Sequence, residues 1–210
     1  ADVSVSPLGT AAAVRSLALA AAVRARRYKS PIRNRIAGAL LQRLRKAIID
    51  NEHFTVMVVM PVHPEGPWPH DSGTRYVMHW QYETICRGGG SLLQRLAREF
   101  PGVDLRRYIN FYALRTHGFR ADGAACTEMV YVHTKLLIVD DDVAICGSAN
   151  INDRSMLGER DSEIAVHVYD LDRVLSPMAG ARVEVGRRVK QLRVRIWREH
   201  LGLGEFVAEQ

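Results

Sequence analysis

The sequence predicts a protein of the α/β class, with a mixed, mostly parallel sheet flanked by helices on both faces. Two observations lead to this class. Apolar runs of strand length, at 54–60 and 136–139, end at a proline or at acidic turn residues, as buried strands do. The segment 34–50 instead repeats its apolar residues at helical spacing. With 210 residues, 47% of them hydrophobic, the chain is long enough to bury one sizeable core.

Residues 1–33 form a basic, Ala-rich N-terminal segment that is expected to be peripheral or disordered, ahead of a single domain at 34–210. No acidic residue occurs between Val3 and Ile49. Such a composition is typical of a targeting or membrane-surface segment, and equally of a solvated helix or a disordered lead-in. The net charge of +6 favours an anionic partner, either a phospholipid surface or nucleic acid. The basic residues in this region are Arg15, Arg24, Arg26, Arg27, Lys29, Arg33, Arg35, Arg43, Arg45 and Lys46.

The first predicted elements of the domain follow from periodicity and from chain-breaking residues. The segment 34–50 predicts an amphipathic helix that packs on a sheet with its basic side outward. The β-branched run 54–60 stops at Pro61 and predicts a buried parallel strand. A helix is expected over 75–88, because three consecutive glycines follow. The next helix, 92–100, is expected to stop at a proline.

Four further segments outside the central motif have a predicted conformation. Residues 108–114 are a strand candidate, and a polar, Gly-containing loop is expected to follow through Ala125. Residues 162–169 alternate enough to predict a strand. The segment 182–201 is expected to close the chain as a basic helix.

The most informative stretch is a predicted strand at 132–139. In an extended strand alternate side chains share a face, so His133 and Lys135 are expected to point the same way. A proton-transferring or nucleophilic group then stands beside a cation that can bind phosphate. The apolar residues 136–139 predict that this strand lies in a buried position.

A second strand is expected to bring further polar residues to the same place. The acidic run 140–142 predicts a turn, and the apolar run 143–146 predicts a returning strand. The resulting hairpin would carry Ser148 and Asn150 to the end of the sheet where His133 is expected. Together these residues predict half of a phosphodiesterase active site.

The spacing of these residues resembles a known family signature. Six positions match the HxK(x)4D(x)6GSxN pattern of the phospholipase D superfamily, and each residue alone would pass as an ordinary core, strand-edge or turn residue. The segment 151–163 resembles the one that follows the second of the two motifs in eukaryotic phospholipase D, and 79–88, 114–117 and 197–202 resemble other parts of that branch. No internal repeat is found in the chain, so only this second motif is expected here. The six positions are His133, Lys135, Asp140, Gly147, Ser148 and Asn150.

The resemblance implies the fold of a phospholipase D half and a mechanism through a phosphohistidine intermediate. In relatives with two motifs the first usually supplies the nucleophile, so His133 would act as general acid and base. Lys135 and Asn150 would bind the non-bridging phosphoryl oxygens, with Ser148 close by.

A carboxylate is expected to fix the tautomer of the catalytic histidine. Glu163 is the first choice for this role and Asp161 is the reserve. Asp140 belongs to the signature but is expected to be structural, because it follows Lys135 by five residues along the strand. No metal or other cofactor is expected, since lysine and histidine supply the positive charge. The three widely spaced cysteines predict neither a disulfide framework nor a zinc site.

The resemblance implies hydrolysis of a glycerophospholipid such as phosphatidylcholine to phosphatidic acid and the head-group alcohol. Such a chain would be cytoplasmic and peripheral to a membrane. One motif is half a site, so activity would need a homodimer or a partner that carries the first motif. Two alternatives are kept: a dimeric single-motif nuclease, and an inactive fragment that binds membranes. Nucleic acid is the less favoured substrate, because the similarity to phospholipases extends well beyond the hairpin.

Overall fold

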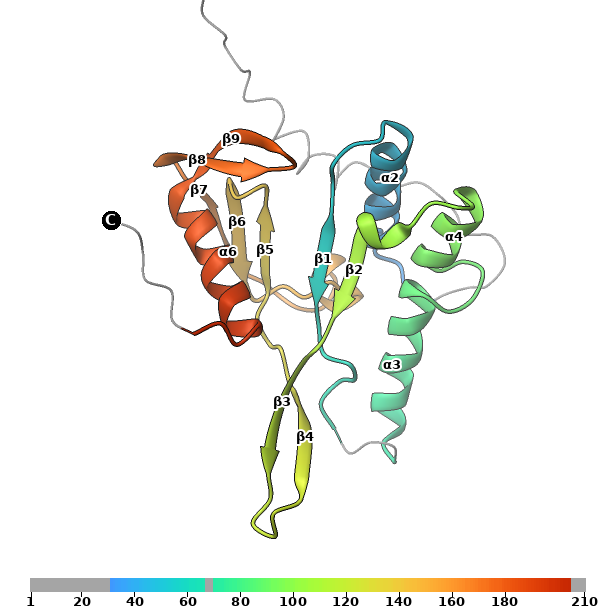
Figure 1. Ribbon diagram of the computed structural model, residues 1–210. Coiled ribbons are helices and arrows are strands. Elements are labelled where there is room, and N and C mark those ends of the chain that lie inside the picture. The colour runs from blue at the N-terminus through green and yellow to red at the C-terminus, as the bar shows by residue number, and fades with distance from the viewer. Residues whose placement is uncertain (1–30, 67–69, 205–210) are drawn as a thin grey trace, which may run out of the picture. The chain divides into compact units, whose positions relative to one another are not determined.

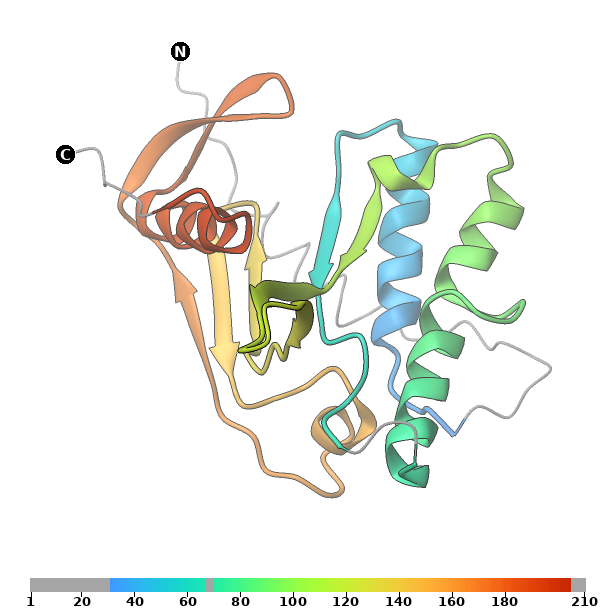
Figure 2. The same cartoon turned by 60° about the horizontal axis from the view of Figure 1, so that its bottom comes forward.

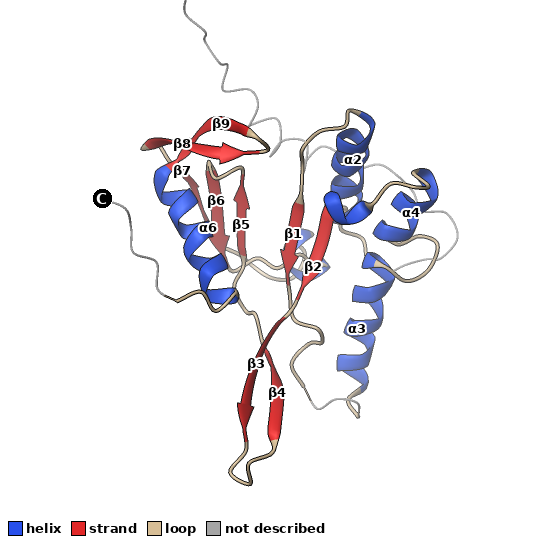
Figure 3. Ribbon diagram, viewed as in Figure 1, coloured by secondary structure: helices blue, strands red, loops and turns tan. Residues whose placement is uncertain are grey.

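The computed structural model describes residues 31–66 and 70–204. These fall into two compact units, which we call the N-terminal unit (31–133) and the C-terminal unit (134–204). Helices and strands occur in both (Figure 3), which confirms the predicted α/β class. Residues 1–30, most of the basic N-terminal segment, lie outside the described residues, and the domain boundary expected after residue 33 stays a prediction.

The N-terminal unit contains the predicted helices and the first predicted strand. Its elements in chain order are α2 (Ile36–Ile49), β1 (Val56–Val59), α3 (Ser72–Ile85), α4 (Leu92–Glu99), the 3-10 turn η1 (Leu105–Arg107), β2 (Ile109–Tyr112), β3 (Leu114–Phe119) and β4 (Ala125–Val130).

A hydrophobic core forms where α2 and α4 pack on the same side of the β1–β2 pair (Figure 1). Leu41 and Leu44 of α2 are almost fully buried, as is Leu96 of α4. These helical residues recur three and four positions apart, so the helical spacing seen in the sequence marks the buried face. Strands β1 and β2 pair in parallel, as expected for the first strand.

The polar loop expected after residue 114 is instead an antiparallel hairpin. Strands β3 and β4 pair from Leu114 opposite Val130 to Phe119 opposite Ala125. Figure 1 and Figure 2 show this ribbon leaving the rest of its unit beyond β2. Nearly all of its side chains are exposed. Without a buried face the strands lack the alternation of apolar and polar residues that predicts a strand, so the pattern of this segment indicates a loop.

The C-terminal unit contains the signature residues from Lys135 onward. Its elements are β5 (Leu136–Val139), β6 (Val143–Gly147), α5 (Asp153–Met156), β7 (Ala165–Tyr169), β8 (Arg173–Met178), β9 (Ala181–Gly186) and α6 (Arg187–His200). Strands β5, β6 and β7 form a three-stranded antiparallel sheet, and β8 pairs with β9.

Two predicted boundaries in this unit are wrong. The strand expected from residue 132 begins only at Leu136, and β5 is half-buried because it lies at the edge of its sheet. The helix expected from residue 182 begins at Arg187, because residues 182–186 belong to β9. Among the described strands, parallel pairing occurs only between β1 and β2. The short connections of the β3–β4, β5–β6 and β8–β9 pairs permit only antiparallel neighbours.

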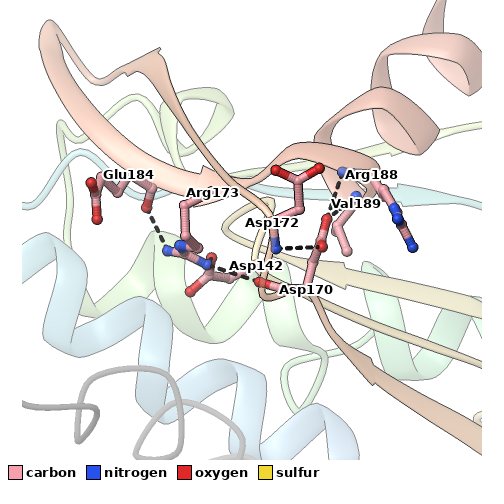
Figure 4. Close-up of polar contacts among 7 residues, drawn as sticks. All are labelled: Asp142, Asp170, Asp172, Arg173, Glu184, Arg188 and Val189. Atoms are coloured by element: carbon pink, nitrogen blue, oxygen red, sulfur yellow. Dashed lines mark hydrogen bonds and ion pairs between the residues drawn. The ribbon is translucent and has the colours of Figure 1, made fainter.

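The turn between β5 and β6 is held by ion pairs to later elements. Asp140 and Asp141 both have positive φ, at 52° and 56°, as in the primed turns that suit two-residue hairpins. The buried carboxylate of Asp141 accepts two hydrogen bonds from Arg193 of α6, at 2.5 and 2.7 Å. Asp142 forms an ion pair with Arg173 of β8 (Figure 4). The far end of the hairpin is therefore anchored to α6 and β8.

Asp170, which follows β7, binds the N-terminus of α6. Its carboxylate accepts hydrogen bonds from the backbone N–H groups of Arg188, at 2.5 Å, and Val189, at 3.3 Å (Figure 4). Burial opposes ionisation of this group, but backbone hydrogen bonds from Asp172 and from these two residues bring the pKa of Asp170 below its ordinary value. An ionised carboxylate at a helix N-terminus satisfies N–H groups that have no partner within the helix.

Candidate active site

The backbone of Lys135 is fixed beside the GSxN segment. Its carbonyl oxygen accepts a hydrogen bond from the N–H of Gly147 at 3.1 Å, which continues the β5–β6 ladder by one residue. The lysine itself is half-buried. Residues 131–135 are not in a strand, so the predicted strand does not reach His133 and Lys135, and the expectation that their side chains share a face stays a prediction.

Ser148 is joined to the segment before β7 through both its backbone and its side chain. Its N–H donates to the carbonyl oxygen of Ile164 at 3.0 Å, and the N–H of Ile164 donates back to Ser148 Oγ at 3.0 Å. The Ser148 hydroxyl donates to Glu163 Oε2 at 2.5 Å. The structure therefore brings together two of the predicted site residues that are fifteen positions apart in the sequence.

These contacts keep Glu163 ionised. The hydrogen bond from Ser148, and then one from Ser155, lower the pKa of Glu163 below its usual value, and the positive charge of Lys135 acts in the same direction. Burial and the negative charge of Asp161 act against this shift without reversing it. The positive charge of Lys135 therefore acts on an ionised carboxylate in this site.

Ser155, to which sequence analysis gave no role, supports two predicted residues. Its hydroxyl oxygen accepts a hydrogen bond from the N–H of Asn150 at 3.1 Å, and its hydroxyl also bonds Glu163. Ser155 is placed by the short helix α5, where the Asn152 side chain caps the N-terminus by accepting from the N–H of Ser155 at 3.1 Å. The Asn-x-x-Ser spacing of an N-cap is the signal that could have found it.

The other two carboxylates lie in different surroundings. Asp161, the reserve choice, accepts a hydrogen bond from Arg154 at 2.8 Å in a partly exposed ion pair. Asp140 occupies the turn at the opposite end of β5 from Lys135. Its place in the turn is compatible with the structural role expected from the sequence.

His133 is the last residue of the N-terminal unit and precedes Lys135 by two positions along the chain. It is exposed, and the ring of Tyr131 lies 6.2 Å from its own ring, measured between centroids. An exposed imidazole is accessible to a substrate, and imidazole is the side chain most often used for proton transfer near neutral pH.

Comparison with known proteins identifies the family. A family model described as Phospholipase D matches residues 22–209. The chain belongs to the phospholipase D family. It is 45% identical over 171 residues to "Phospholipase D A" of Dictyostelium discoideum. The aligned region covers 81% of this chain and 13% of that protein.

Two further phospholipase D relatives give the same result. The chain is 47% identical over 178 residues to "Phospholipase D zeta 1" of Arabidopsis thaliana, covering 82% of this chain and 16% of the relative. It is 46% identical over 173 residues to "Phospholipase D1" of Homo sapiens, covering 80% and 16%. The chain therefore spans only about a sixth of the length of these relatives or less.

A steric constraint explains why the phospholipase D signature has a glycine at position 147. A Cβ atom at Gly147 would lie 2.3 Å from the carbonyl oxygen of Ile164 and 2.7 Å from Cα of Ala165. Both are backbone atoms that cannot move aside without breaking the β6–β7 pairing. Only glycine at this position permits the close approach that places Ser148 against Glu163.

No helix among the described residues of this phospholipase D chain combines the length and the apolar character needed to cross a bilayer.

Proposed function

We propose that this chain supplies one His-Lys half of a phospholipase D active site that hydrolyses phosphatidylcholine to phosphatidic acid and choline. The observation that supports this most is the hydrogen-bonded cluster of Ser148, Ser155 and Glu163, which holds an ionised carboxylate under the influence of Lys135. This cluster is built from the signature residues and the segment after them, in a chain whose relatives are named phospholipase D.

In the first proposed step the nucleophilic histidine, which comes from the other His-Lys motif supplied by a partner or by a second copy of the chain, attacks the phosphorus atom. A phosphorus–nitrogen bond forms, the bond from phosphorus to the choline oxygen breaks, and His133 donates a proton to that oxygen. Lys135 and Asn150 stabilise the negative charge on the non-bridging oxygens, where charge resides in the transition state. A carboxylate would fix the tautomer of the catalytic histidine and stabilise its protonated form, and Glu163 is the first choice for this role.

In the second proposed step the neutral His133 removes a proton from water. The water oxygen attacks phosphorus, the phosphorus–nitrogen bond breaks, and phosphatidic acid leaves while the first histidine is regenerated. A primary alcohol can replace water in this step, in which case a phosphatidyl alcohol is formed. Lysine and histidine supply the positive charge throughout, so the proposed reaction uses no metal ion.

The proposed chemistry needs two histidines, and the sequence contains one motif of this type. The second histidine comes either from another copy of this chain or from another polypeptide segment that carries the first motif. Because the substrate resides in a bilayer, the protein works as a peripheral protein at a membrane surface, and the net charge of +6 suits an anionic surface.

The substrate class can be tested directly. The chain, alone and mixed with a polypeptide that carries the first motif, is incubated with phosphatidylcholine vesicles or with DNA, and its mass in solution is measured in parallel. We expect choline and phosphatidic acid from the vesicles, phosphatidyl alcohol when a primary alcohol is added, and no cleavage of DNA. Cleavage of DNA without lipid hydrolysis would instead establish the dimeric nuclease, and binding to vesicles without any turnover would establish a membrane-binding module.

A further inference from the structure

The β3–β4 ribbon has two chemically different faces. The register pairs Arg115 with Met129, His117 with Thr127, and Phe119 with Ala125. Because alternate residues of a strand share a face, these six side chains lie on one side of the ribbon. We call this side the basic-aromatic face. It contains one arginine, one histidine and one large aromatic ring, and no acidic residue.

The acidic residues of the hairpin lie elsewhere. Glu128 pairs with Thr116 on the opposite face. Asp122 lies in the turn, where its carboxylate accepts a hydrogen bond from the N–H of Ala124 at 2.9 Å. Arg120, at the tip, is exposed. The basic-aromatic face and the tip together are therefore cationic.

The apolar part of this surface is left in solvent. The Phe119 side chain is 80% exposed, although it lies in a regular strand. The ring of His117 is held across the ribbon, with 2.8 Å between its Nδ1 and Thr127 Oγ1. An isolated two-stranded ribbon is at best marginally stable in water. A surface that accepts both the aromatic ring and the cations would stabilise it.

We propose that the basic-aromatic face of the β3–β4 ribbon docks on an anionic phospholipid bilayer. Phe119 enters the interface, where aromatic rings are favoured, and Arg115 and Arg120 bind lipid phosphates. The combination of cations with an exposed ring, and the absence of carboxylates from this face, selects an anionic lipid surface over an acidic or a purely apolar protein partner. This inference extends the proposed function, which places the substrate in a bilayer.

The ribbon is also continuous with the candidate site. Strand β4 ends at Val130, and His133 follows three residues later in the same unit. A ribbon docked on the bilayer would therefore hold the start of the signature segment close to the lipid surface.

The test measures binding of the full 210-residue chain to vesicles of phosphatidylcholine mixed with phosphatidylserine, by flotation and without any measurement of turnover. Phe119→Ser and Arg115→Glu are each expected to lower the partition coefficient about tenfold. Phe119→Trp retains the aromatic ring and is expected to bind as the wild type does. Thermal unfolding of each variant shows whether the fold is kept.

Matched variants outside the ribbon serve as controls. Leu171→Ser removes another apolar side chain of similar exposure, 81%, and Arg195→Glu makes the same charge change on the exposed side of α6. Both variants are expected to bind within about twofold of the wild type, because neither side chain lies on the proposed docking face, where a cation would contribute to binding. The proposal is overturned if the ribbon variants bind like the wild type, or if the controls lose as much binding as they do.

The outcome separates this inference from the proposed function. Loss of vesicle binding in the ribbon variants together with an absence of lipid hydrolysis would leave the docking surface in place and reject the enzyme. Hydrolysis of phosphatidylcholine vesicles together with unchanged binding of Phe119→Ser would support the enzyme and reject the docking surface.

Discussion

At the scale of single residues, Ser148 matters most through the carboxylate that it holds. Its hydroxyl donates to Glu163 and its backbone is bonded to Ile164 on both sides. A serine placed in this way orients the carboxylate and keeps it charged. Ser148 therefore acts on the carboxylate that also feels the positive charge of Lys135.

The first prediction concerns the pKa of Glu163. Ser148→Ala removes the largest cause of the lowered pKa, so the pKa of Glu163 is expected to rise toward its ordinary value of 4.5. Because the pKa of Glu163 is lower in the folded state, ionised Glu163 stabilises the protein above pH 4.5, and this stabilisation is lost as the pH falls through the lowered pKa. Between pH 4.5 and the lowered pKa, the free energy of unfolding should therefore fall less for the variant than for the wild type. Carbon NMR of the carboxyl group during a pH titration measures the shift, and an unchanged pKa would refute the assignment.

The second prediction concerns the ion pair that anchors the signature hairpin. The Asp141 side chain is 1% exposed and that of Arg193 is 24% exposed. Arg193→Ala leaves a buried carboxylate without its bidentate partner and is expected to lower the free energy of unfolding by about 3 kcal/mol. Chemical denaturation measures this loss. Arg106→Ala, in the exposed pair with Asp104, is the matched control and should have little effect.

The sequence motif selects the candidate site residues but does not predict their contacts. Lys135, Ser148 and Glu163 were all selected from the signature and the segment after it, and the structure links them. Ser155 was missed because its role depends on the fold of α5, which turns its hydroxyl toward Asn150 and Glu163. The ion pair of Asp161 with Arg154 could not be inferred either, since spacing along an irregular segment does not fix a side-chain direction.

At the scale of secondary-structure elements, the sequence pattern predicts an element correctly when that element buries one face. Helices α2 and α4 and strand β1 line the core, so their apolar spacing predicted them. Hairpin β3–β4 has mostly exposed side chains and therefore lacks that signal. Residues 182–185 alternate charged and apolar side chains, as strands do, and Gly186 separates them from the helix, so this pattern could have predicted a strand here.

The third prediction tests the close approach of β6 and β7. Gly147→Ala places a methyl group against the backbone at Ile164 and Ala165, and is expected to lower the free energy of unfolding by about 1–3 kcal/mol. Gly118→Ala in β3 is the matched control, because a Cβ atom there would meet nothing within 4 Å. Thermal and chemical unfolding measure both. Equal stability of the two variants would contradict the steric account of the signature glycine.

At the scale of the whole molecule, the chain joins a helical N-terminal unit, which contains the largest hydrophobic core cluster and the exposed ribbon, to a C-terminal unit built around the signature hairpin. The boundary between them falls at His133 and Thr134, inside the signature. The α/β class followed from the alternation of helical and strand patterns. The division within the signature could not be predicted, because the strand signal at 132–139 was continuous.

The last prediction concerns choline release from phosphatidylcholine vesicles, which tests the proposed chemistry most directly. The measurement compares wild type, His133→Ala and the control His167→Ala, each alone and mixed with a polypeptide that carries the first His-Lys motif. Release is expected only from a dimer or from the mixture, with His167→Ala unaffected and His133→Ala reduced at least about a hundredfold, as for loss of a general acid–base group. Turnover by a monomeric chain, or full turnover by His133→Ala, would contradict the account.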